Sequence, residues 1–197
     1  MVTASRSVGR PREFDKDAAL TAAMDAFWSK GFEATSMADL CACTGLHKGS
    51  IYQTFGDKHS LFMQALQHYS ETEFNDVAAQ AYLYESPLES VRAVMHKVVE
   101  HACDGRGCLM INSLVELAPH NDEVLRFLED FRDVRMRMMQ DLIEKAQAAG
   151  EINAQQDSEQ LAIRLMVVLA GAATAVKGFM TSEQAHAVVE DAVGTLG

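Results

Sequence analysis

Apolar side chains along this chain recur every three or four residues, and no strand-length segment alternates apolar with polar residues. In the first such segment the positions are i, i+3, i+4, i+7 and i+8, which places their side chains on one face of an α-helix. These positions are Leu20, Ala23, Met24, Phe27 and Trp28. The same pattern predicts further helices beginning near residues 36, 47, 57, 87, 108, 122, 158 and 183. The chain is therefore predicted to be all-α.

The two short helices after the first are joined by a tight turn at residues 44–46 that contains a glycine. Such an arrangement is typical of a helix-turn-helix. The second of these helices has a small, polar outer side that includes Gly49 and Ser50, whereas Ile51 and Phe55 are expected to face inward. Small side chains allow a helix to approach base edges in the major groove. The spacing alone also allows a plain helical hairpin with a solvated polar face.

The charge of the chain divides it into two parts. The formal net charge is -11, which taken alone argues against a nucleic-acid-binding protein. However, residues 1–60 carry 7 basic and 7 acidic side chains, whereas residues 61–197 carry 10 and 21. We therefore expect a neutral N-terminal domain over residues 1–60 and an acidic helical domain over residues 61–197. No segment is expected to cross a membrane, and the protein is expected to be cytoplasmic.

The segment GFEATSMADLCACTGLHKGSIYQTFGDKHSLF resembles the DNA-binding domain of TetR/AcrR-type transcriptional regulators. Matching features include the pair Gly31-Phe32, the turn at residues 44–46, the run at residues 48–52 and the pair Asp57-Lys58. The preceding residues 9–12, Gly-Arg-Pro-Arg, are similar to the N-terminal arm of that family. The resemblance covers about residues 9–66 and implies a three-helix DNA-binding domain followed by a ligand-binding and dimerisation domain.

The resemblance also implies roles for individual residues on double-stranded operator DNA. Lys48, Tyr52 and Lys58 would contact phosphates, as would the start of the second helix at Ser36. His47, Gly49, Ser50 and Gln53 would lie at or near base edges. Arg10 and Arg12 would enter the minor groove or touch phosphate.

The acidic domain is expected to dimerise and to bind a small effector. The run at residues 170–175 has only small side chains, which favours either close approach of two helices or an internal buried helix. The resemblance favours a homodimer through about residues 158–194. Methionine suits adaptable apolar pockets, so an apolar or amphipathic effector is expected. The candidate lining residues are Met95, Met110, Leu114, Phe127, Phe131 and Met138. Asn112 and Glu116 are candidates to orient a ligand, or are simply exposed.

Cys103 and Cys108 flank a glycine-rich turn, and Arg106 between them could favour a thiolate. A thiol-based redox or electrophile sensor is therefore an alternative function. A metal site or a helical Cys/His enzyme near His96 and His101 is less favoured, because no ligand or nucleophile spacing supports it. The sequence thus predicts a DNA-binding regulator, a repressor released by its effector, with no cofactor, no metal and no enzymatic activity.

Overall fold

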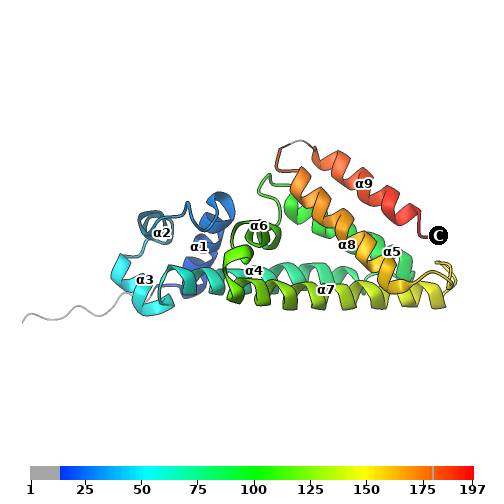
Figure 1. Ribbon diagram of the computed structural model, residues 1–197, viewed down its shortest axis with the longest axis horizontal. Helices are drawn as coiled ribbons and strands as arrows, with labels where there is room; N and C mark the ends of the chain where they lie inside the picture. Colours follow the sequence, from blue (N-terminus) through cyan, green and yellow to red (C-terminus); the bar gives the residue numbers. More distant parts are fainter. Residues whose placement is uncertain (1–13, 179) are drawn as a thin grey trace, which may run out of the picture.

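The computed structural model describes residues 14–178 and 180–197, and within them the regular structure is entirely helical. The elements are α1 (Lys16–Lys30), α2 (Met37–Thr44), α3 (Lys48–Phe55), α4 (Lys58–Gln80), α5 (Pro87–Ala102), α6 (Leu109–Glu116), the 3-10 helix η1 (Ala118–His120), α7 (Asp122–Ala148), α8 (Ser158–Ala175) and α9 (Ser182–Gly194). The predicted fold class is confirmed. We call α1–α3 the head and α5–α9 the body; α4 joins them (Figure 1).

Local capping explains why several helices begin where the sequence predicts. The Asp15 side chain accepts hydrogen bonds from the first-turn amides of α1. Ser36 and Asp39 form a reciprocal capping box at the start of α2. Pro87 lies in the first turn of α5, where its missing N–H costs nothing. Gly45, at φ 69°, ends α2 in the left-handed conformation that glycine adopts most easily.

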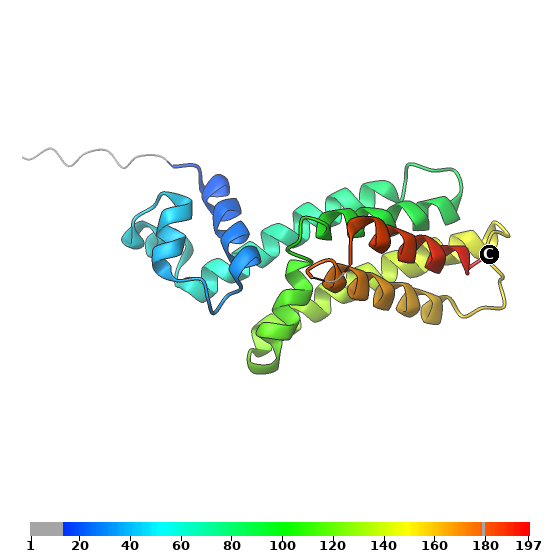
Figure 2. The same cartoon turned by 90° about the horizontal axis from the view of Figure 1, so that it is seen from above.

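Two apolar clusters form the core. One joins the head to α6 and the start of α7, and it contains the edge-to-face pair Phe27 and Phe62, with ring centroids 5.1 Å apart. The other joins α5, α7, α8 and α9 with the end of α4. The expected domain boundary at residues 60/61 falls in the first turn of α4, which continues through both clusters. The head is therefore attached to the body by a helix, as both views show (Figures 1 and 2).

Helix α8 is the one described helix that is long and apolar enough, by length and composition alone, to cross a membrane. This finding does not contradict the expectation that no segment crosses a membrane, because a helix packed in the core of a folded domain passes the same test. Its inner face, which includes Leu161, Leu165 and Leu169, is buried in the body core against α7 and α9. This packing covers one side of the helix, and the other side lies on the outside of the body.

Candidate functional site

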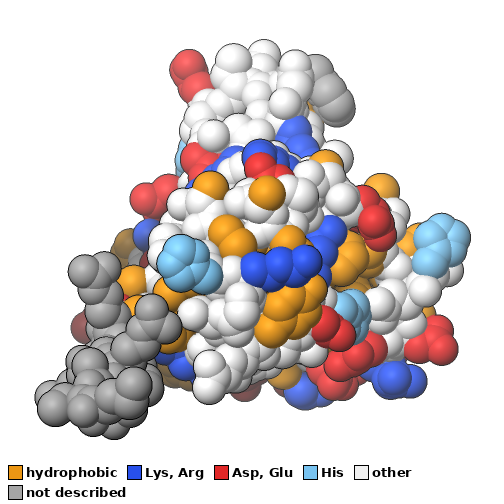
Figure 3. Space-filling model, turned by 90° about the vertical axis from the view of Figure 1, so that its left-hand side faces the viewer, with side chains coloured by type: hydrophobic (Ala, Val, Ile, Leu, Met, Phe, Trp, Pro, Cys, Tyr) orange, Lys and Arg blue, Asp and Glu red, His pale blue; other side chains and the backbone are white. Residues whose placement is uncertain are grey.

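The outer side of α3 carries the residues that the sequence predicts at DNA. His47, Lys48, Gly49, Tyr52 and Gln53 are all exposed. Ile51 and Phe55 point the other way into the core, as predicted. The space-filling view of this end shows basic and apolar side chains together in the middle of the face (Figure 3). The arrangement leaves the outer side of α3 open to a partner.

Ser50 is half-buried beside this surface, and the start of α3 offers free donors. The amide of Ser50 donates to the His47 carbonyl, but the His47 side chain makes no capping bond. The amides of Lys48 and Gly49 therefore have no partner within the helix. Backbone donors of this kind, together with the helix dipole, favour an anion such as a phosphate.

Two lysines of the predicted interface have no acidic partner within the described part of the chain. The Nζ of Lys48 lies 5.8 Å from the Tyr52 ring centroid, and that of Lys58 lies 4.3 Å from the Phe32 ring. Lys16 is similarly placed 5.7 Å from Phe55, although the sequence did not mark it as an interface residue. Lys30, by contrast, is paired with Asp39 at 2.5 Å. Two lysines of the head and one at the start of α4 thus remain available for phosphate groups.

The donor groups of Ser36 are already used within the protein, which the sequence does not reveal. Its amide and hydroxyl both donate to Asp39, at 2.8 Å and 2.5 Å. Hydrogen bonds from Lys30 and Ser36 hold the pKa of Asp39 well below its usual range. A phosphate at this helix start would therefore meet the amides of Met37 and Ala38 rather than the serine itself. The predicted contacts of Arg10 and Arg12 lie outside the described residues.

The head is held to the body through α6 and the loop before it. The Glu116 carboxylate accepts hydrogen bonds from the amides of Phe32 at 3.0 Å and Glu33 at 2.9 Å. A side chain on Gly31 would approach that carboxylate to 2.8 Å, so the glycine permits this contact. Glu116 is therefore not a ligand-orienting residue but a link between α6 and the turn after α1.

Arg106 and Trp28 form a second link. The Arg106 guanidinium lies 3.7 Å from the Trp28 ring and pairs with Asp25 and Asp104. The Trp28 indole N–H donates to the Gly107 carbonyl at 3.0 Å. Arg106 is therefore occupied by carboxylates, which corrects the expectation that it favours a cysteine thiolate. Asn112 donates to the Arg106 carbonyl and accepts from Lys177, so it also stabilises the loop instead of facing a ligand.

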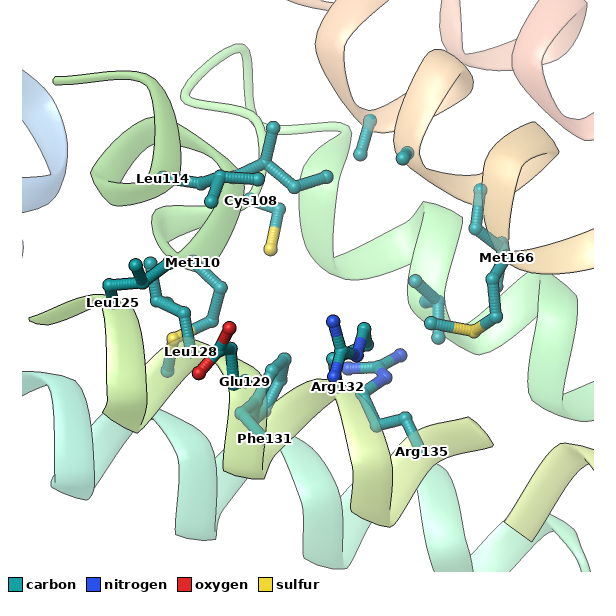
Figure 4. A pocket seen from close by; sticks show the side chains of 15 residues that line it. Cys108, Met110, Leu114, Leu125, Leu128, Glu129, Phe131, Arg132, Arg135 and Met166 are labelled. Carbon is teal, nitrogen blue, oxygen red and sulfur yellow. The ribbon is translucent and has the colours of Figure 1, made fainter. Parts of the chain in front are cut away.

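A cavity of about 260 Å³ lies between α6, α7 and α8 (Figure 4). Most of its lining is apolar, including Ile111 of α6, Leu128 of α7 and Met166 of α8. Its volume is close to the lower end of the range of about 300–1,000 Å³ for small-molecule sites. The cavity therefore suits a small, mostly apolar ligand.

Only half of the predicted lining residues reach this cavity. Met110, Leu114 and Phe131 line it. Met95 and Met138 lie instead in or against the body core, and Phe127 lines a separate surface depression between α4 and α7. Helical periodicity identifies the apolar face of a helix, but it does not tell which part of that face meets a neighbour and which part meets a gap.

The charged residues of the cavity are not among those predicted from the sequence. Glu129, Arg132 and Arg135 follow one another at helical spacing along α7 (Figure 4). Arg135 is buried and paired with Glu73 of α4, whose two oxygens both lie 2.7 Å from one guanidinium nitrogen. In the sequence, Arg135 interrupts the apolar stripe of α7. That position was the signal that could have identified it as a buried charge.

The two cysteines of the alternative function do not come together. Cys103 packs against the body cluster, Cys108 packs against the head cluster, and both are free. Burial raises the pKa of the Cys108 thiol, and the Tyr69 hydroxyl lies 3.7 Å from its sulfur. Since the thiolate is the reactive form, this environment does not favour a thiol sensor.

Iodoacetamide at pH 7 is accordingly expected to modify exposed Cys43 well before Cys108, although the pKa of Cys43 is also raised by partial burial. Mass spectrometry of peptides from the native protein measures both rates. The same reaction after unfolding in guanidinium is the control, and there the two rates should converge. Rapid modification of Cys108 in the native protein would contradict this assignment.

The histidines near the cysteines have other partners. His96 contacts His186 at 2.8 Å and Glu190 at 3.1 Å, while His101 pairs with Asp76. Within residues 14–178 and 180–197, no three His, Cys, Asp or Glu side chains gather in a way that would hold a metal ion. The histidine contacts join α5 to α9 through His96 and α5 to α4 through His101.

An apolar stripe runs along the outer side of α8. Ile163 and Val167 are exposed, and they are followed one and two turns later by exposed Gly171 and Thr174. In the run at residues 170–175, the three alanines at 172, 173 and 175 are buried in the core. One side of this run is therefore internal, and the other side is exposed on the surface. We call residues 163, 167, 171 and 174 the α8 stripe.

Comparison with known proteins places this geometry among bacterial regulators. The model described as "Bacterial regulatory proteins, tetR family" matches residues 19–65, and "Tetracyclin repressor-like, C-terminal domain" matches residues 87–193. The chain is 34% identical to the HTH-type transcriptional repressor ComR of Escherichia coli strain K12 over 170 residues, covering 84% of this chain and 81% of ComR.

Solved structures similar to this chain also include TetR family regulators. A cysteine mutant of the TetR family regulator CifR, complexed with 26bp double-strand operator DNA, has a TM-score of 0.81 and 31% identity. That match covers 96% of this chain and 100% of the CifR chain. A TetR regulator from Chloroflexus aurantiacus has a TM-score of 0.83 at 21% identity, covering 90% and 91% of the two chains, and supports the fold alone.

Proposed function

Since the chain belongs to the TetR family of bacterial transcriptional regulators, we propose that it is a homodimeric repressor that binds operator DNA through α3 and leaves it when a small molecule fills the cavity. The observation that carries the proposal is the outer side of α3. It combines small residues for close approach, free first-turn amides and Lys48, with Lys58 nearby at the start of α4; neither lysine has an acidic partner among the described residues. The similar CifR chain forms a complex with operator DNA, which supports a DNA-binding role for this chain as well.

The dimer is proposed to form through α8 and α9. The α8 stripe offers an apolar face without bulky charged side chains at its centre, and Val188 of α9 is also exposed. Two such faces pack closely because small side chains allow helices to approach. A two-fold dimer would place two α3 helices on a palindromic DNA site.

The route from cavity to head is proposed to pass through α6. Ile111 and Leu114 of α6 line the cavity, while Glu116 at the end of the same helix binds the turn after α1. A ligand that displaces α6 therefore displaces the support of the head. By linkage, ligand and operator then weaken each other's binding by the same factor.

In vitro selection from a random-sequence duplex library tests the proposal, because such a library contains every candidate operator. The expected product is a palindrome whose half-sites lie one helical turn of DNA apart, or a multiple of one turn. A parallel selection with a Lys48→Ala, Tyr52→Phe double variant is the control and should enrich the palindrome poorly. Absence of any enriched sequence with the unmodified protein would refute the proposal.

Gly49→Ala is expected to change folding and DNA binding in opposite directions. A methyl group at this position meets no atom within 4 Å, and alanine favours a helix by about 0.8–1.0 kcal/mol over glycine. The free energy of unfolding should therefore rise or stay unchanged, while affinity for the selected operator falls because the methyl group occupies space next to DNA. Urea denaturation and fluorescence anisotropy measure the two effects, and unchanged affinity would remove Gly49 from the interface.

Tyr52→Phe is expected to weaken binding to every sequence alike, because its hydroxyl is assigned to a phosphate. A hydrogen bond of this kind is worth about 0.5–1.5 kcal/mol. Ser50→Ala should instead change the ranking among operators with single base substitutions. Tyr82→Phe is the matched control, since Tyr82 is exposed between α4 and α5. An equal loss across the panel for Ser50→Ala would contradict this division of roles.

A further inference from the structure

We propose that the cavity binds an apolar monocarboxylate, whose carboxylate is held by Arg135 at the inner end of the cavity. This inference names the class of the effector and so rests on the proposed function for its regulatory meaning. Four features of α7 and its neighbours support the binding site itself: an arginine with unused donors, the placement of the cavity charges, the apolar walls, and the ion pair to α4.

The first feature is the incomplete pairing of a buried guanidinium. Arg135 is only 6% exposed, yet its contacts with Glu73 both use the same nitrogen, Nη1. The Nε and Nη2 groups have no hydrogen-bond partner among the described residues, and the side chain lines the cavity. No buried polar side-chain atom of the described residues lacks a partner, so these two groups reach the open space of the cavity. They are donors that can bind an acceptor entering that space.

The second feature is the placement of charge within the cavity. Glu129 and Arg132 are exposed and belong to the outer part, and Arg132 is also paired with Asp133 at 2.7 Å. At the inner end Arg135 lines the cavity and Glu73 does not, so that end presents donors and a positive charge. An ammonium group would be repelled by this charge. A carboxylate would find the planar pair of N–H groups that arginine uses for bidentate binding.

The third feature is the apolar remainder of the wall. Leu128, Met110 and Met166 surround the space in front of the two guanidinium groups (Figure 4). These side chains would cover an alkyl or aromatic body and exclude water from it. A strongly hydrated dianion such as free phosphate is disfavoured, because a surface of this kind cannot replace its water shell. One negative charge on a short apolar body matches both parts of the cavity.

The fourth feature links this site to α4. Arg135 is the group through which α7 holds Glu73, and α4 runs from that point to the head. A carboxylate on Nε and Nη2 would share the positive charge that now belongs to Glu73 alone. The ligand would therefore weaken the attachment of α4 to α7 at the same time as it contacts α6.

Isothermal titration calorimetry of the full chain without DNA tests the site. The probes are butanoate, hexanoate, octanoate and decanoate, with 1-octanol, octylamine and methyl octanoate as matched neutral or cationic controls. We expect at least one carboxylate to bind, and octanoate to bind at least about tenfold more tightly than its three controls, as a charge-assisted hydrogen bond implies. Binding of octanol or octylamine as tight as that of octanoate, or no binding by any carboxylate, would overturn the proposal.

Three variants separate this role of Arg135 from a purely structural one. Arg135→Lys should lower octanoate affinity at least about tenfold, because a lysine held by Glu73 lacks the second pair of donors. Glu73→Gln should raise the affinity, because the guanidinium no longer shares its charge; an unchanged or lower affinity would contradict the proposal. Arg137→Lys, an exposed neighbour on α7, is the matched control and should have no effect.

If circular dichroism shows that the Arg135→Lys protein does not fold, Met166→Trp tests whether octanoate binds in the cavity. This change fills the cavity without altering the ion pair, so it should abolish octanoate binding. Octanoate binding equal to that of the unmodified protein would place the ligand elsewhere and refute the site. Because these titrations contain no DNA, their failure is independent of any failure of operator binding.

Discussion

Val167→Glu is expected to convert the protein to a monomer and to lower operator affinity at least about a hundredfold, because two half-sites then have to be bound separately. The carboxylate would lie at the centre of the α8 stripe, where the proposed dimer brings two copies of it together in an apolar contact. Analytical ultracentrifugation at micromolar concentration measures the mass, and anisotropy measures the affinity.

The matched control is Leu83→Glu. Leu83 and Val167 are both 66% exposed, but Leu83 lies between α4 and α5, away from the proposed interface. It should leave both mass and affinity unchanged. A dimeric Val167→Glu protein with normal operator affinity would exclude the α8 stripe from the interface.

Arg135→Met is expected to lower the free energy of unfolding by about 3–5 kcal/mol, since it leaves the Glu73 carboxylate buried without its partner. Glu73 is 3% exposed and the Arg135 side chain 6%, so water does not compensate for the loss. Burial alone would lower the pKa of the Arg135 guanidinium, but charge attraction and hydrogen bonding, chiefly from Glu73, together raise it above its usual value.

The double variant Glu73→Leu, Arg135→Met should recover most of that stability, because neither charge is then left alone. Urea denaturation of the four proteins closes the double-mutant cycle. A double variant less stable than Arg135→Met alone would contradict the assignment of the loss to an uncompensated charge.

Much of the head could be predicted from local sequence, because its helices are set by neighbouring residues. Asp15 and the Ser36–Asp39 pair cap α1 and α2 within three residues of the groups they bind. Gly45 ends α2 because the turn requires a positive φ. The resemblance over residues 9–66 then assigned roles to the exposed positions of α3, which periodicity alone could not do.

The body was less predictable because its important contacts join distant parts of the chain. Glu73 and Arg135 are 62 residues apart, and Glu116 binds amides 84 and 83 residues away. Nothing local distinguishes these carboxylates from solvated ones. Likewise Met95 and Met110 have the same side chain on similar helices, but only Met110 meets the gap between α6 and α7. The different roles of the two methionines depend on where the tertiary fold places their helices.

The overall charge of -11 also takes on a different meaning in the structure. Among the described residues, Lys16 and Lys48 of the head and Lys58 at the start of α4 have no acidic partner, whereas acidic residues predominate after residue 60. An acidic body would be repelled from the DNA backbone and would leave contact to the two heads. Since the N-terminal part is neutral in total, specific contacts have to provide most of the affinity.

The most direct test is therefore the ratio of affinities for the selected palindrome and for random duplex DNA of the same length, measured by competition anisotropy at physiological salt. The expected ratio is at least about 10³, the lower end of the range for specific regulators. A ratio near one would contradict specific recognition by α3, because the protein would then bind DNA only through sequence-independent contacts between lysine side chains and phosphates.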